Sequence, residues 1–214
     1  MVKQRTELIN SIRSYLFEFG HVIPKGTRHL RRVVELISDE TITLAQAVRG
    51  ICQDLLNEIE RKTLHINAKL KKINAMSHEQ ASLRRLQTMP GVGPITAVAV
   101  ETFAPPMETF RRGRDFSAWL GLVPRQNSTG GKQRLGRTSK MGQRDIRRLL
   151  IIGAMSVVNW ASRGHDMKNR WVEKMLTRKP RMLVAVALAN KMARMIWAML
   201  TNKEDYRLPV TASA

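Results

Sequence analysis

A long segment from Ile42 to about Met76 contains no proline and one glycine, Gly50, which leaves little room for any structure other than a helix. Apolar residues recur along it every three or four positions, with a gap at Lys62: Leu44, Val48, Ile51, Leu55, Ile59, Ile66, Leu70 and Ile73. They form a narrow stripe with charged residues around it. This near-heptad stripe favours a coiled-coil arm or a dimerising hairpin. The alternative is a surface helix that packs on its own domain.

The rest of the chain also has helical spacing. Helices are expected at Thr6–Phe19 and Leu30–Ile37, and a last helix at Pro180–Leu200 is apolar on most of its circumference and should lie in a core. The predicted fold class is therefore all-α. Residues 1–80 are expected to form the helical, coiled-coil arm, residues 81–208 a compact helical domain, and residues 209–214 a disordered tail.

The charge balance indicates a polyanionic partner. The 214 residues include 37 Lys and Arg against 17 Asp and Glu, a formal net charge of +20, while 43% of residues are hydrophobic. A chain of this composition folds, yet it repels itself unless an anion neutralises it. Nucleic acid is the commonest such partner, and DNA is the favoured one.

Other classes of protein fit less well. The single cysteine, Cys52, excludes an internal disulfide framework and indicates a reducing, cytoplasmic compartment. The longest apolar run, Leu149–Ala161, contains Asn159 and is shorter than the roughly 20 residues of a membrane span, so no membrane role is expected. The five histidines are dispersed and the acidic residues lie among lysines and arginines, so no metal site is predicted.

The first motif is the segment LQTMPGVGPITAVAV, Leu86–Val100. A helix should end at Met89, turn through Pro90–Gly93, and restart at Pro94, as in a helix-hairpin-helix motif. The glycines permit close approach of a phosphate, and the amides of the next helix point at it. We therefore expect Gly91, Val92 and Gly93 to hold a DNA backbone without reading its sequence.

The second motif is a basic stretch from Arg111 to Arg148, in which only Asp115 and Asp145 are acidic. Between Pro124 and Gly142 apolar residues nearly vanish and four glycines appear, which predicts a flexible cationic loop. The loop suits a phosphodiester, because arginines stabilise charge on phosphoryl oxygens. Its cations are expected to bind DNA: Arg125, Lys132, Arg134, Arg137, Lys140 and Arg144.

The same loop carries hydroxyl groups at Ser128, Thr129, Thr138 and Ser139. A serine among arginines can attack a DNA phosphate and form a phosphoserine link. Serine and threonine are also common simply as hydrogen-bond donors to phosphate. Local chemistry alone leaves both roles open.

Three blocks together resemble the carboxy-terminal domain of the insertion-sequence-110 family of transposases. They are LQTMPGVGPITAVAVETF, FSAWLGLVPRQNSTGGKQRLGRTSKMGQRDIRRLLIIGA and ALANKMARMIWAML, and the upstream RTELINSIRSYLFEFGHVIPKG resembles that family's segment leading into a coiled coil. The resemblance implies a site-specific DNA recombinase, in some members guided by a structured RNA. In this family a serine in the loop after Gly-Leu-x-Pro-Arg-Gln is the nucleophile, which corresponds to Ser128 here. Ser139 is the fallback.

The family also has an amino-terminal RuvC-like domain with four metal-binding carboxylates, which this sequence does not show. We therefore expect that the chain binds no cofactor itself, that Mg²⁺ acts only with that domain, and that the chain alone transposes little DNA. The expected function is serine attack on a DNA phosphodiester during transposition, in oligomers with itself or a full-length transposase, at the bacterial nucleoid. The alternative is a non-catalytic DNA- or RNA-binding module that interferes with the full-length enzyme.

Overall fold

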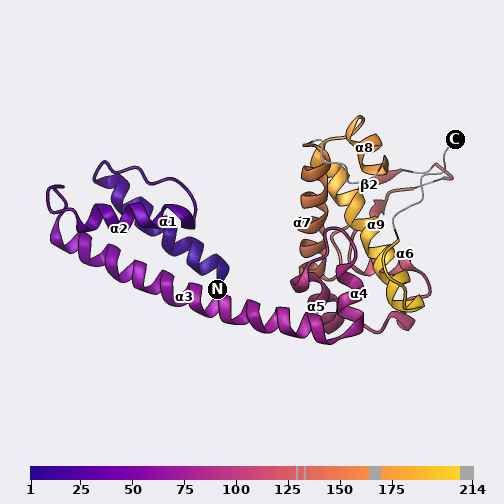
Figure 1. Ribbon diagram of the computed structural model, residues 1–214. Coiled ribbons are helices and arrows are strands. Elements are labelled where there is room, and N and C mark those ends of the chain that lie inside the picture. Colours follow the sequence, from indigo (N-terminus) through magenta and orange to yellow (C-terminus); the bar gives the residue numbers. More distant parts are fainter. Residues whose placement is uncertain (129, 133, 164–169, 208–214) are drawn as a thin grey trace. The chain divides into compact units, whose positions relative to one another are not determined.

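The computed structural model describes residues 1–128, 130–132, 134–163 and 170–207, and within them it is almost entirely helical (Figure 1). This confirms the predicted all-α class. The chain divides into two compact units, Met1–Lys72 and a second that begins at Ile73, and the division falls within a long helix. The tail expected at 209–214 lies outside the described residues.

The first unit contains three helices that share one core. They are α1 (Val2–Glu18), α2 (Leu30–Ser38) and the greater part of α3 (Gln46–Glu79), with a short 3₁₀ turn at Thr27–His29 before α2. Ile12 and Leu16 of α1 and Val33 of α2 are fully buried. Cys52 and Ile59 of α3 belong to the same buried cluster.

The apolar stripe of α3 is therefore used, at least in part, inside its own unit. Ile59 is 3% exposed and packs in this core, whereas Ile51 on the neighbouring face is 44% exposed. Arg5 of α1 donates from Nη1 to Thr63 Oγ1 of α3 at 3.3 Å, so the two helices also meet through polar groups. This is the intramolecular packing that the sequence offered as an alternative to a coiled coil. Pairing of α3 with a second chain stays a prediction.

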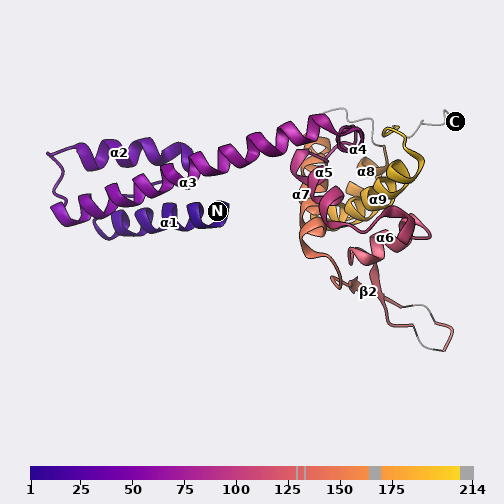
Figure 2. The same cartoon turned by 90° about the horizontal axis from the view of Figure 1, so that it is seen from below.

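The second unit is built on α9 (Arg181–Asn202), which packs against α4, α6, α7 and α8. The other helices are α4 (Ala81–Gln87), α5 (Pro94–Phe103), α6 (Gly113–Trp119), α7 (Arg144–Ala161) and α8 (Arg170–Leu176), with a 3₁₀ turn at Met107–Thr109. Both views show α7 and α9 side by side (Figures 1 and 2). Burial of α9 agrees with the expectation that the last long helix lies in a core.

Among the described helices, α9 is long and apolar enough to cross a membrane by length and composition. Its polar side chains instead bind groups of its own unit. Trp197 Nε1 donates to the carbonyls of Met107 and Phe110, and Asn190 Nδ2 donates to the carbonyl of Leu122. Val184, Leu188 and Ile196 are buried. These contacts describe a core helix.

The basic loop between α6 and α7 contains a two-stranded ribbon. Strand β1 (Pro124–Gln126) pairs antiparallel with β2 (Leu135–Thr138), in a register that shifts between Pro124 and Gln126. Figure 2 shows the ribbon extending away from the helices of its unit. The sequence predicted a flexible loop here. The sequence does not indicate the paired strands, because their residues are mostly polar, cationic or glycine rather than β-branched.

Candidate nucleic-acid interface

The predicted hairpin motif forms α4, a turn and α5. Val92 in the turn is 5% exposed, and its amide donates to the carbonyl of Met89 at 3.0 Å. Val92 therefore fixes the turn in the core, and its N–H is already committed. Gly93 is exposed, and a Cβ built there would meet no heavy atom within 4 Å. Of the three residues expected to hold a DNA backbone, Gly93 leaves the most room for a phosphate.

Gly91 makes a close contact with α7. Its φ of +88° is one that glycine adopts readily and residues with a Cβ rarely adopt, and a Cβ on it would lie 2.8 Å from the carbonyl oxygen of Gly153. The turn and α7 thus approach at two glycines. The packing of the turn on α7 requires glycine at position 91, with or without DNA. The prediction that Gly91 also binds DNA therefore concerns its backbone atoms only.

The start of α5 has the form of an anion site. Pro94 occupies the first helical position, and the amide of Ala97 makes the first bond back to Gly93. The amides of Ile95 and Thr96 precede that bond, and the first amides of a helix have no partner within it. With the helix dipole, they favour a phosphate oxygen beside Gly93.

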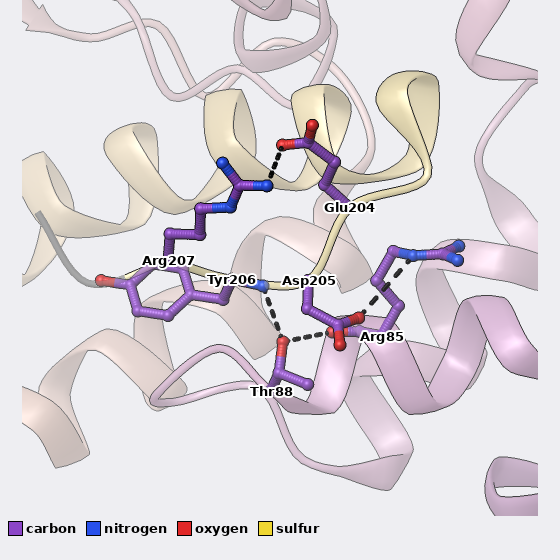
Figure 3. A network of polar contacts seen from close by, with 6 residues as sticks. All are labelled: Arg85, Thr88, Glu204, Asp205, Tyr206 and Arg207. Atoms are coloured by element: carbon purple, nitrogen blue, oxygen red, sulfur yellow. Dashed lines mark hydrogen bonds and ion pairs between the residues drawn. The ribbon is translucent and has the colours of Figure 1, made fainter.

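The segment after α9 binds the end of α4, just before this turn (Figure 3). The amide of Tyr206 donates to Thr88 Oγ1 at 2.9 Å, and the same hydroxyl donates to the carbonyl of Arg85 at 2.7 Å. Asp205 Oδ1 lies 3.8 Å from Arg85 Nε. Burial raises the pKa of the Tyr206 hydroxyl. The turn thus packs on α7 through Gly91, and the end of α4 that leads into it is held by Asp205 and Tyr206.

The ribbon and the residues that follow it, as far as the start of α7, present their cations to solvent. The side chains that the sequence assigned to DNA binding are all exposed: Arg125, Lys132, Arg134, Arg137, Lys140 and Arg144. In the part of the chain that the structure describes, no carboxylate forms a salt bridge with any of them. Their charge is therefore available to an external anion.

The two candidate serines lie at different places on the ribbon. Ser128 follows β1, is exposed, and its Oγ accepts a hydrogen bond from the amide of Arg134 at 3.2 Å. Ser139 follows β2 and is half-buried, and its amide donates to the carbonyl of Val123 at 2.8 Å. Ser128 is the more accessible of the two and is held beside an arginine. Thr129 lies outside the described residues.

Two side chains from the helices hold the base of the ribbon. Arg147 Nη1 of α7 donates to the carbonyl of Leu120 at 2.9 Å and to that of Gly142 at 3.5 Å, so it joins the chain before the ribbon to the chain after it. Asn190 of α9 donates to the carbonyl of Leu122. From the sequence, Arg147 was only one of the basic residues of the Arg111–Arg148 stretch, and Asn190 had no role. Neither contact can be predicted from the sequence, because both depend on which helices pack against the base of the ribbon.

This arrangement predicts different effects for neighbouring arginines. Arg147→Ala should loosen the base of the ribbon, so that hydrogen exchange at the amides of Ser139 and Lys140 speeds up about tenfold. These amides donate to the carbonyls of Val123 and Gly121. Arg148→Ala removes the same charge from an exposed position and should leave both rates unchanged. Equal exchange in the two variants, measured by NMR or mass spectrometry, would show that Arg147 does not hold the ribbon.

The described residues contain no group of three or more His, Cys, Asp or Glu side chains arranged to hold a metal ion. Asp115, one of the two acidic residues in the basic stretch, lies 3.9 Å from Arg112 Nε. The expectation that Mg²⁺ acts only with an additional domain is not tested by this structure.

Comparison with known proteins supports a family assignment. The model of the transposase IS116/IS110/IS902 family matches residues 83–170, which include the hairpin turn and the ribbon. A probable family 20 transposase of Pseudomonas aeruginosa is 40% identical over 209 residues, which is 97% of this chain and 62% of that protein. The transposase for insertion sequence element IS1111A of Coxiella burnetii is 35% identical over 208 residues, 97% of this chain and 57% of that protein.

A putative transposase of Sinorhizobium fredii is 37% identical over 210 residues, 97% of this chain and 54% of that protein. The chain thus spans between about half and three fifths of the length of these relatives. Residues 83–170 match the IS116/IS110/IS902 family of transposases, and nearly the whole chain is similar to proteins described as transposases.

Proposed function

We propose that the chain binds DNA and takes part in strand exchange during transposition, with Ser128 as the nucleophile. The observation that carries the proposal is an exposed serine hydroxyl, held by the Arg134 amide on a ribbon whose cations have no acidic partner among the described residues. The relatives, all described as transposases, support the same class of reaction.

The chemistry is a transesterification. Ser128 Oγ forms a bond to phosphorus, the bond from phosphorus to a sugar oxygen breaks, and that oxygen leaves with a proton. Arg125, Arg134 and Arg137 stabilise the charge on the remaining phosphoryl oxygens. Gly93 and the first amides of α5 bind a different phosphate, further along the DNA.

Ser128 needs a base, and its contact in this structure does not supply one. Its oxygen accepts from an amide N–H, which cannot take up the serine proton. We propose that metal-bound carboxylates of a full-length transposase supply it in a mixed oligomer, with Mg²⁺ bound by that partner. On this account the chain alone forms little covalent adduct. A structured guide RNA and a location at the nucleoid in the cytoplasm belong to the same proposal.

A non-catalytic module is the second candidate. It is favoured by the hydrogen bond that Ser128 accepts from the Arg134 amide. A serine held in this way is equally suited to binding a phosphate without attacking it. Such a chain would enter mixed oligomers and reduce transposition. Covalent protein–DNA adducts formed with a full-length relative present distinguish the two, because only the first candidate forms them.

DNA binding itself should depend steeply on salt. With six exposed cations on the ribbon, the loop after it and the start of α7, affinity for a short duplex should fall by about 10³-fold between 50 and 200 mM salt. Lys132→Gln should reduce the slope of log K against log salt by about one. Lys69→Gln, the same change at an exposed position on α3, should leave the slope as it is. A flat response of the unaltered chain would refute phosphate binding by this surface.

A further inference from the structure

The ribbon presents side chains of two kinds on one face. Gln126 of β1 and Leu135 of β2 are direct partners in the register, and cross-strand partners project from the same face. An amide and an alkyl group are thus brought together.

Neither of these side chains is used by the core. Leu135 is 60% exposed. Gln126 is exposed as well. Phosphate binding uses the cations of the ribbon and gives no role to a leucine or a glutamine, so the proposed function leaves both unexplained.

The major groove of B-form DNA matches this face in size and chemistry. It admits a two-stranded β-ribbon, whereas the minor groove is about half as wide. Glutamine pairs with adenine N6 and N7, and an alkyl side chain contacts the thymine methyl group. Gln126 and Leu135 stand opposite each other, as the two contacts of one A·T pair require.

The ribbon is also fixed by hydrogen bonds at its base and beyond its paired strands. Arg147 and Asn190 fix its base through the carbonyls of Leu120 and Leu122, and Asn127 donates from its amide to the carbonyl of Arg134 beyond the paired strands. A ribbon fixed at both levels keeps the face of Gln126 and Leu135 in one orientation, which reduces the entropy lost on binding.

We propose that the ribbon enters the major groove of duplex DNA, with Gln126 and Leu135 against base edges and Arg134 and Lys132 on the flanking phosphates. This inference rests on the proposed function, since it assumes that the chain binds DNA. It adds a groove, a duplex substrate and a preference for an A·T pair.

Modified duplexes test it with the full chain. Glucosylated 5-hydroxymethylcytosine in place of cytosine fills the major groove and leaves the phosphates and the minor groove unchanged. It should lower affinity at least about tenfold, as expected from the loss of one or more base contacts. Uracil in place of thymine removes only the methyl group and should lower affinity less. Netropsin, which occupies the minor groove, should have little effect.

Variants assign the effect to the ribbon. Leu135→Ala should reduce the difference between the thymine and uracil duplexes, because the alkyl partner of the methyl group is gone. Leu183→Ala removes a leucine that is 50% exposed on α9 and should leave the difference unchanged. Both side chains are exposed, so neither change should disturb folding.

The outcomes distinguish a failure of this inference from a failure of the proposed function on which it rests. Equal affinity for unmodified and glucosylated duplexes, with a steep salt dependence, would overturn the groove assignment and leave DNA binding intact. Displacement by netropsin, or binding to single-stranded DNA as tight as to duplex, would also overturn it. Failure to bind any of these DNAs would refute the proposed function itself.

Discussion

Ser128→Ala is expected to abolish covalent adducts between this chain and DNA when a full-length relative is present. The change removes the attacking oxygen and nothing that the core uses, because Ser128 is exposed and its contact is with the Arg134 amide. Loss of a nucleophile should lower adduct formation by at least about 10³-fold. DNA affinity should stay within about twofold, since one neutral hydroxyl contributes little beside the cations.

Adducts are measured after denaturation, by the mass of the protein attached to labelled DNA. The 214-residue chain and a longer relative give products of different mass, so the serine of the relative does not obscure the result. Ser139→Ala is the matched control and should retain adducts, because Ser139 is half-buried and bonded through its amide to Val123. Adducts that survive Ser128→Ala and disappear in Ser139→Ala would make Ser139 the nucleophile.

Periodic helices could be predicted from the sequence because their evidence is local. The apolar stripe of residues 180–200 predicted α9 within two residues at each end, and Pro90–Gly93 predicted the turn between α4 and α5. In each case the deciding feature was a spacing or a turn residue within a short window. The apolar stripe on α3 predicted the helix but did not identify the surface against which the helix packs. A near-heptad stripe serves equally well for packing on α1 and for packing on another chain.

Contacts between distant segments had no such local signal. The ribbon depends on pairing Pro124–Gln126 with Leu135–Thr138, and glycine-rich cationic sequence conceals it. Tyr206 reaches Thr88 from more than a hundred residues away, and Arg147 reaches back to Leu120. These contacts arise from the packing of helices, which composition and periodicity do not define. The residue types of the candidate site could thus be predicted from the sequence. The side chains that hold these residues in place could not.

The approach of Gly91 to Gly153 gives the largest expected effect on stability. Gly153 lies inside α7, and a Cβ there would overlap the carbonyl oxygen of Gly91. The overlapped atom is backbone, so the turn or α7 must move. Gly153→Ala should therefore destabilise the second unit by about 2–3 kcal/mol, even though alanine is the better helix former. Thermal unfolding followed by circular dichroism should show a midpoint lower by roughly 6 °C.

Gly50 provides the matched control, because it too lies inside a helix and a Cβ there would meet nothing within 4 Å. Gly50→Ala should raise stability by about 0.5–1 kcal/mol through the lower entropy of the unfolded chain. The opposite signs separate steric overlap from helix propensity, which favours alanine at both positions. Gly153→Ala should also weaken DNA binding, because the turn that carries Gly93 is displaced. A stabilising effect at both positions would mean that the turn does not pack on α7 at Gly153.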